Sequence, residues 1–218
     1  SIWFYGLRNT FQLLYNPYKK ETGYLFSLLK SHPDKVDLPE HIENLMAHCK
    51  SLEKALHKFF VKLGKNIRKT QKGDKIRFQG SLALEYNTNP EPIFENFQQL
   101  EQKVQGLQEY FASWAPAAAH HLLNQFKQKL ETIHQNLLFL TDANKKDWVY
   151  WVEEPGNPHK LKITASPLHI DEEFKEKLFP WIKSAIFTSA TLSISGSYHY
   201  FKNQIGLPNK VKSLNFES

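Results

Sequence analysis

Residues 39–70 read PEHIENLMAHCKSLEKALHKFFVKLGKNIRKT, and their apolar side chains recur at alternating steps of three and four. This period matches the turn of an α-helix, so the apolar set lies on one side of a single long helix. The seam consists of Ile42, Leu45, Cys49, Leu52, Leu56, Phe59, Leu63 and Ile67. Asp37 and Pro39 suit the start of a helix, and Gly73 suits its end. We therefore predict a helix from about Pro39 to about Thr70.

Two further long stretches show the same helical period, and Pro116 separates them. The first runs from Phe94 to Phe111 and the second from Leu122 to Leu140. Shorter helices are expected at about residues 3–15 and 24–30. Long helices joined by short turns are typical of a bundle. The first two thirds of the chain are therefore expected to be helical.

The sequence changes character after about Asp142. Residues 148–152 and 161–166 are rich in Val, Tyr, Trp and Ile and are predicted to be paired strands. After a short amphipathic helix, residues 184–193 form an apolar run that ends in small hydroxyl residues, which indicates a buried strand. Earlier in the chain, residues 75–86 indicate a short hairpin or an irregular excursion.

The composition limits the class of protein. Of 218 residues, 41% are apolar and 14% aromatic, which favours a packed core over a disordered or fibrous chain. No stretch approaches the roughly 18 apolar residues of a membrane helix, so we expect no membrane partner. The single cysteine, Cys49, cannot form an internal disulfide, which suits a cytoplasmic protein. Because the chain begins with Ser1 and its only methionine is Met46, we expect a processed terminus or a fragment of a longer protein.

Positive charge is concentrated in one segment. Nine Lys or Arg residues and a single Asp lie from Lys54 to Arg77. The regularly spaced lysines are Lys58, Lys62, Lys65, Lys69 and Lys72. One interpretation is a solvated helix face, and the other is a strip that holds the phosphates of a nucleic acid. Under the second interpretation, Arg77 and Phe78 would combine a phosphate contact with stacking on a base.

A complete active site is not evident in the sequence. No G-x-x-x-x-G-K-[ST] phosphate loop occurs, and no Asp-Glu pair follows an apolar strand to hold magnesium. His120 and His121 are adjacent on a helix and point about 100° apart, so they do not suit one metal ion. Cys49 lies on the apolar seam and fits a packed thiol better than a nucleophile. We expect this chain to bind no metal.

A motif near the carboxyl end resembles helicase motif III of the DinG and XPD family, in which an apolar strand ends in Ser-Ala-Thr-Leu. The residues that carry the resemblance are Ile186-Phe-Thr-Ser-Ala-Thr-Leu-Ser193, Gly196, Tyr200-Phe201 and Gly206-Leu207. Residues 165–168 and 214–218 also look like that family. The resemblance is specific over about residues 160–218. Over residues 1–146 it is positional, because a helical insertion, called the arch in XPD, precedes motif III in this family.

The resemblance implies an α+β chain, predominantly helical, with two parts. Residues 1–146 would be an arch-like helical bundle, and residues 147–218 a small α/β remnant of the first RecA-like motor domain. The hydroxyls of Ser189 and Thr191 would hydrogen-bond to the magnesium-binding loop of a neighbouring strand, and Ala190 would allow close packing. Motif III would thereby couple ATP hydrolysis to movement on DNA.

The resemblance further implies an ATP-dependent DNA helicase, that is, a hydrolase active in DNA repair, with 5′ to 3′ polarity and a cytoplasmic, nucleoid-associated location. ATP and magnesium would bind to the remaining motor domains of the full-length protein, and single-stranded or forked DNA would be the partner. This chain alone is expected to be inactive. Whether the parent protein has an iron-sulfur cluster or an added nuclease domain is not decided by this sequence.

Two alternatives from other classes remain. A non-enzymatic helical adaptor would use the apolar seams to bind a partner helix. A nucleic-acid-binding module would use only the basic face, and its binding would be sensitive to salt without any link to a nucleotide.

Overall fold

The chain is an α+β protein in which helices predominate, and it folds into two compact units. The computed structural model describes residues 2–3, 9–15, 22–70, 75–153, 160–189, 191–208 and 210–214. The first unit comprises residues 1–145 and 149–165, and the second comprises residues 146–148 and 166–218. The first unit therefore holds the long helices together with most of the two strands that follow them.

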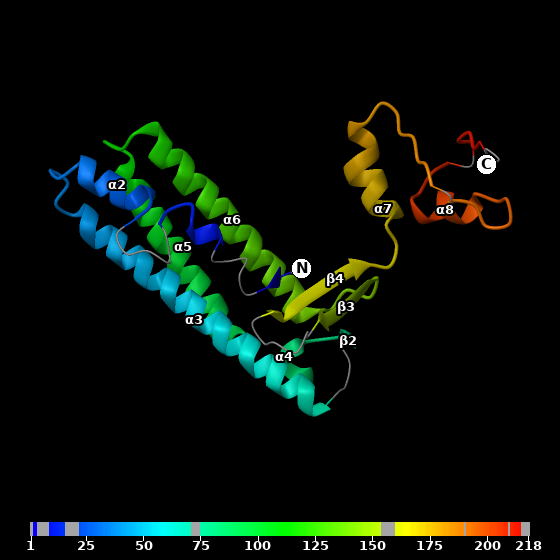
Figure 1. Ribbon diagram of the computed structural model, residues 1–218, viewed down its shortest axis with the longest axis horizontal. Helices are drawn as coiled ribbons and strands as arrows, with labels where there is room; N and C mark the ends of the chain where they lie inside the picture. The colour runs from blue at the N-terminus through cyan, green and yellow to red at the C-terminus, as the bar shows by residue number, and fades with distance from the viewer. Residues whose placement is uncertain are drawn as a thin grey trace. The chain divides into compact units, whose positions relative to one another are not determined.

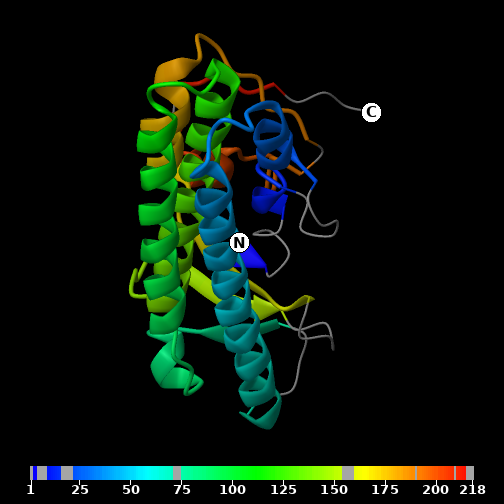
Figure 2. The ribbon, with the colours of Figure 1, turned by 90° about the vertical axis from the view of Figure 1, so that its left-hand side faces the viewer.

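Three long helices form the body of the first unit (Figures 1 and 2). They are α3 (Leu38–Thr70), α5 (Glu91–Phe111) and α6 (Ala117–Asp142), and α5 lies against both of the others. The short helix α2 (Tyr24–Ser31) packs against α3. The bundle predicted from the helical periods is thus confirmed.

The apolar seam of α3 is buried at every predicted position. The buried members are Ile42, Leu45, Cys49, Leu52, Leu56, Phe59, Leu63 and Ile67. On α5 the buried side chains are Ile93, Phe97, Leu100, Val104, Leu107 and Phe111. These two seams meet between α3 and α5, so the core of the first unit is built from residues one helical turn apart.

Local signals set the ends of these helices. Pro116 has an extended backbone and stands directly before α6, as expected for a residue without an amide hydrogen. At the other end of α6, Ala143 adopts a left-handed conformation with φ 44°, and its N–H donates to the carbonyl of Phe139. The helix therefore closes at Asp142, where the character of the sequence changes.

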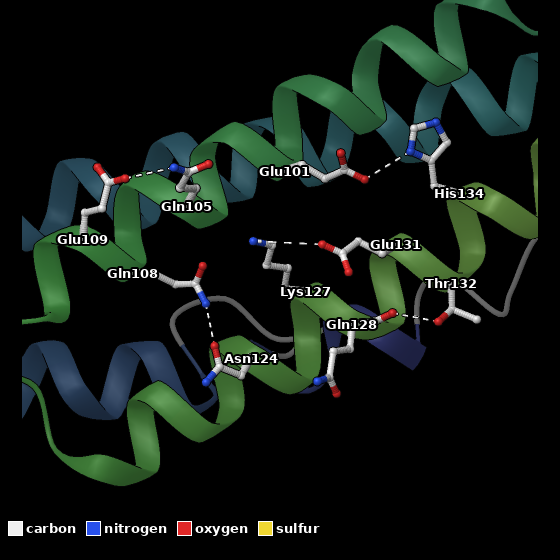
Figure 3. Close-up of polar contacts among 10 residues, drawn as sticks. All are labelled: Glu101, Gln105, Gln108, Glu109, Asn124, Lys127, Gln128, Glu131, Thr132 and His134. Carbon is white, nitrogen blue, oxygen red and sulfur yellow. Dashed lines mark hydrogen bonds and ion pairs between the residues drawn. The ribbon is translucent and has the colours of Figure 1, made fainter.

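Polar side chains bridge α5 and α6 at two levels along the helices (Figure 3). Gln108 on α5 donates to Asn124 on α6 at 2.6 Å. Two turns of α5 away, Nδ1 of His134 lies 3.1 Å from Oε1 of Glu101. Because each pair joins one position on each helix, the two contacts fix the register of α6 against α5.

A four-stranded sheet lies at the end of the helical bundle where α5 begins and α6 ends (Figure 1). Its strands are β1 (Ile2–Trp3), β2 (Lys75–Phe78), β3 (Trp148–Glu153) and β4 (Lys162–Pro167), in the order β1-β4-β3-β2. β2 pairs antiparallel with β3, from Lys75 opposite Glu153 to Phe78 opposite Tyr150. The two strands predicted after Asp142 are confirmed, while the turn expected at residues 155–158 lies outside the described residues.

Two expectations for the first unit were wrong. Residues 75–86 form no local hairpin, because β2 finds its partner in β3 and is followed by the short helix α4 (Leu82–Glu85). Trp3, expected to begin a helix, instead ends β1, which pairs antiparallel with β4. In both cases a partner more than 70 residues away along the chain overrides the local pattern.

The second unit contains short helical segments. These are α7 (Asp171–Glu173), the π-helical turn η2 (Phe174–Leu178), the 3₁₀ turn η3 (Phe179–Trp181) and α8 (His199–Gln204). The strand expected over residues 184–193 is not formed in their described parts, 184–189 and 191–193, and Ile186 is 90% exposed. A strand with two apolar faces requires neighbouring strands and covering layers, and none of the described residues supplies them.

Candidate nucleic-acid interface and coupling segment

The predicted lysine strip lies on the solvent side of α3. Lys58, Lys62, Lys65 and Lys69 are all exposed, while the apolar seam on the other side of the helix is buried. Among the described residues, none of these four ammonium groups forms an ion pair, in contrast to Lys75, whose Nζ lies 3.9 Å from Glu153. Lys72 lies outside the described residues. The strip therefore offers positive charge that no described carboxylate neutralises.

The expected base-stacking position is corrected by the structure. Arg77 is exposed on β2, but Phe78 beside it is only 6% exposed. The ring of Phe78 packs against those of Tyr86 and Tyr150, at centroid distances of 6.4 and 5.9 Å. Alternation along a strand sends neighbouring side chains to opposite faces, so Arg77 faces solvent while Phe78 enters the core. Phe78 has no open ring face for a base.

Lys54, the first residue of the predicted basic segment, extends the regularly spaced set that begins at Lys58. Lys54 is exposed on α3, four residues before Lys58, and so lies on the same side of the helix. The spacing of four was visible in the sequence. Lys54, Lys58 and Lys62 together line a groove whose other wall comes from the start of α5. No sequence signal pointed to that second wall, because the two walls meet only through the packing of α5 on α3.

Ser189 and Thr191 form a compact hydroxyl pair. Their Oγ and Oγ1 atoms lie 3.1 Å apart, and the backbone N–H of Thr191 donates to Oγ of Ser189 at 3.2 Å. Both residues are exposed, whereas Ala190 lies outside the described residues. The two hydroxyls thus sit on one local turn, where a single acceptor or donor from another segment can reach both.

Many large apolar side chains of the second unit are exposed. In the second unit, the side chains of Trp181 and Ile186 are 84% and 90% exposed. Ile205, by contrast, is buried. The other exposed large apolar residues of this unit are Leu168, Leu178, Ile182, Ile194, Tyr200, Val211 and Leu214. In the first unit, only Val36 and Leu84 among the described large apolar residues are exposed. Most of the exposed large apolar side chains of the described residues therefore belong to the second unit.

The segment after the hydroxyl pair is held by two contacts. The ring of Phe187 meets that of Phe201 on α8 edge to face, with centroids 5.5 Å apart. Gly206 follows α8 with φ +71°, and a Cβ built there would lie 2.6 Å from Cε of Lys175 and 3.0 Å from the Asp171 carbonyl oxygen. Asp171 and Lys175 are themselves paired at 3.1 Å, which holds the pKa of Asp171 below its ordinary value. Glycine is required here for both its conformation and its size.

The remaining candidates for chemistry are structural. Cys49 is fully buried, and burial raises the pKa of its thiol to about 12. The thiol therefore stays protonated and acts as a packed apolar group. Among the described residues, no three His, Cys, Asp or Glu side chains gather in a way that could hold a metal ion. Within the same part of the chain, no helix has the length and apolar content to cross a membrane.

Part of the chain is similar in sequence to known proteins. The ATP-dependent DNA helicase YoaA of Haemophilus influenzae is 28% identical to the chain over 118 residues, which are 54% of the chain and 18% of that protein. YoaA of Escherichia coli is 31% identical over 86 residues, 39% of the chain and 13% of that protein. The chain is related to the DinG-like helicases. This confirms the relationship predicted from the Ser-Ala-Thr motif.

A third member of the DinG-like group has a different named activity. The 3′-5′ exonuclease DinG of Bacillus subtilis is 23% identical over 121 residues, 53% of the chain and 13% of that protein. The chain thus matches less than a fifth of the length of each of these DinG-like relatives. No family model matches the chain. No solved structure matches it either.

Proposed function

We propose that this chain is part of an ATP-dependent DNA helicase that translocates on single-stranded DNA. The similarity to two ATP-dependent DNA helicases carries this proposal. In it, ATP and magnesium bind to other parts of the full-length protein, and single-stranded or forked DNA is the substrate. The protein would then work in the cytoplasm, at the nucleoid, in DNA repair. Residues 1–146 would form the arch-like part and residues 147–218 a part of the first motor domain.

Ser189 and Thr191 are assigned the coupling role. Each hydroxyl can donate one hydrogen bond and accept others, so the pair can follow a change at an acidic, magnesium-holding loop. Their exposure and their separation of 3.1 Å support this assignment, because both oxygens are available to the same partner. A shift of that partner on hydrolysis would move the pair, and the contact of Phe187 with Phe201 would pass the movement to α8.

The exposed apolar residues of the second unit support a place within a larger motor domain. The segment before the hydroxyl pair has the sequence pattern of a buried strand, yet its residue Ile186 is exposed in this chain. Covering such a strand on both faces is the usual arrangement in parallel sheets. In the proposal, strands of the remaining motor domain cover Ile186 and its neighbours.

The adaptor alternative is less well supported. An adaptor that binds a partner helix needs an open apolar seam, whereas the α3 seam is buried against α5 within the chain itself. A nucleic-acid-binding module without a motor is favoured by the basic strip on α3 alone. A measurement of ATP hydrolysis with and without DNA distinguishes such a module from a helicase, because only a helicase couples DNA binding to ATP hydrolysis.

The test uses the full-length protein that contains this chain. We expect DNA-stimulated ATP hydrolysis and unwinding of forked DNA by the wild type. Replacing Ser189 and Thr191 by Ala should reduce unwinding by at least about tenfold, which corresponds to ~1.4 kcal/mol, while most of the ATP hydrolysis remains. Ser184→Ala, which removes an exposed hydroxyl outside the motif, is the matched control and should change neither rate. An ATPase unaffected by DNA in the wild type would contradict the proposed function.

A further inference from the structure

A groove of about 430 Å³ runs between α3 and the start of α5. Lys54, Lys58 and Lys62 form the wall contributed by α3, and Asn89 and Asn96 stand on the wall contributed by α5. Successive lysines are four residues apart, so their Cα atoms rise about 6 Å per step along the helix axis. The wall from α3 is therefore a row of ammonium groups at a regular spacing.

The charge of the groove is unbalanced. None of the described residues that line it is acidic. Among the described residues, no carboxylate pairs with Lys54, Lys58 or Lys62, although Lys127 on α6 lies 4.0 Å from Glu131. An anion that entered the groove would meet three cations without first having to displace a protein carboxylate. Each such contact with a phosphate also releases counterions, which favours binding at low salt.

The wall from α5 adds neutral polar groups. Oδ1 of Asn89 accepts the N–H of Glu91 at 3.0 Å, which leaves the amide Nδ2 of Asn89 without a partner among the described residues. Nδ2 of Asn96 donates to the carbonyl of Pro92 and leaves its Oδ1 toward solvent. The positive end of the α5 dipole lies at the same place. This wall can therefore donate a hydrogen bond to an anionic oxygen without adding charge.

The bottom of the groove is apolar and closed. Phe59 and Ile93 line it, but they are only 4% and 1% exposed. The ring of Phe59 therefore has no open face on which a base could stack. The two apolar side chains also offer no hydrogen-bonding groups that could recognise a base. Such a groove would recognise a phosphate backbone and would show little preference for sequence.

We propose that this groove seats two or three consecutive phosphates of single-stranded DNA. The inference deepens the proposed function and rests on it for the choice of DNA as the polyanion. The distance from Lys54 to Lys62 is about 12 Å along the helix, which one mononucleotide phosphate cannot span. Packed helices lie about 8–10 Å apart, axis to axis, so the groove between them is too narrow for a duplex. A flexible single strand meets both limits.

The experiment measures binding of a fluorescent oligothymidylate of about 12 nucleotides to the whole chain. Three phosphate contacts at a salt slope of about −0.7 each predict a roughly 20-fold loss of affinity between about 50 and about 200 mM salt. In a variant with Gln at Lys54, Lys58 and Lys62, the slope should become shallower by about 2, and the affinity at low salt should fall by at least tenfold, or ~1.4 kcal/mol. The matched control places Gln at Lys30, Lys127 and Lys129, which removes the same charge away from the groove.

A second variant separates the groove from the general field of the helix. Ala55→Trp fills the groove without any change of charge, because Ala55 lines it. It should weaken binding of the oligonucleotide several-fold, while circular dichroism verifies the helical content of each variant. A duplex of the same length and pyrophosphate should compete poorly with the oligonucleotide.

Three outcomes would overturn the inference. They are an equal loss of affinity in the control triple variant, unaltered binding in Ala55→Trp, and equal binding of single strand and duplex. A full-length protein that unwinds DNA normally while its groove variants bind the oligonucleotide like the wild type would reject the groove and leave the proposed function standing. Groove-dependent binding by a protein that lacks DNA-stimulated ATP hydrolysis would reject the helicase and retain the groove.

Discussion

The imidazole of His134 on α6 stacks on the ring of Phe97 on α5, with the two centroids 4.7 Å apart and the planes 5° from parallel. Nδ1 of His134 also lies 3.1 Å from Oε1 of Glu101 (Figure 3). One buried side chain thus makes both an aromatic and a polar contact between the helices. His134→Ala should lower the free energy of unfolding by about 2–4 kcal/mol, through the cavity left behind and the unpaired carboxylate.

Chemical denaturation followed by circular dichroism measures the effect of His134→Ala. His121→Ala is the matched control, since His121 is exposed on the same helix. It should change the free energy of unfolding by no more than about 0.5 kcal/mol. Similar losses for both variants would show that the contacts between His134, Phe97 and Glu101 contribute little.

Gly206→Ala should destabilise the second unit. The added methyl group would pay about 1–2 kcal/mol for the left-handed backbone and would also meet Asp171 and Lys175. Gly196→Ala is the control, because Gly196 has φ +78° but no atom within 4 Å of an added Cβ. Hydrogen exchange of the amides between residues 166 and 214 should therefore accelerate more in Gly206→Ala than in Gly196→Ala. Equal acceleration in the two variants would mean that the close packing of Gly206 against Asp171 does not contribute to the stability of the second unit.

Cys49 should resist alkylation in the folded chain. Its side chain is buried, and its thiol, with a pKa of about 12, is almost wholly protonated at pH 8. We expect iodoacetamide to modify the thiol only after unfolding, at a rate set by the opening of the first unit. Mass spectrometry over a denaturant series measures that rate. Rapid modification in the native state would contradict the packing of α3 against α5.

The same thiol predicts a dependence of stability on pH. The folded pKa of the Cys49 thiol, about 12, is above its ordinary value of 9.0, so the unfolded chain loses this proton first as the pH rises. The contribution is constant below pH 9.0 and declines between 9.0 and about 12. The difference in the free energy of unfolding between wild type and Cys49→Ala should therefore shrink above pH 9. A difference that stays constant up to pH 11 would contradict this prediction.

The exposed apolar side chains of the second unit should cause self-association of the isolated chain. Trp181→Glu combined with Ile186→Glu should remove this association, because these two side chains are 84% and 90% exposed. Leu84→Glu is the control, being 87% exposed in the first unit. Sedimentation velocity at several concentrations measures the effect. A chain that stays monomeric at all concentrations would contradict the prediction.

The elements that were predicted correctly are those whose conformation depends on residues close in sequence. The seam from Ile42 to Ile67 repeats every three or four residues, and each of its members is buried. The pairing of β2 with β3 was not predicted, because the two strands lie more than 70 residues apart and no local pattern indicates the partner. The expected strand at residues 184–193 shows the opposite error. Its apolar pattern is clear, but a strand forms only where another strand is present to pair with it.

The candidate sites follow the same division. The spacing of Lys58 and Lys62 placed them on one side of α3, and that side is exposed. Lys54, the first residue of the predicted basic segment, fits the same spacing and lies on the same side. Asn89 and Asn96 became part of the groove only through the packing of α5 on α3, which sequence periodicity does not describe. The roles of Ser189 and Thr191 stay a prediction, because they depend on a partner segment that no described residue provides.

The ladder between β2 and β3 has a mechanical consequence. It joins Lys75–Phe78 to Tyr150–Glu153, so the chain leaves this point, runs through α5 and α6, and returns to it. A pull along the polypeptide from before Lys75 to after Glu153 would load the backbone hydrogen bonds of this ladder before any tension reached the two helices. Because Lys75 lies opposite Glu153, such a pull opens the ladder from that end, one residue pair at a time. The hairpin of α5 and α6 is therefore loaded only after the ladder has opened.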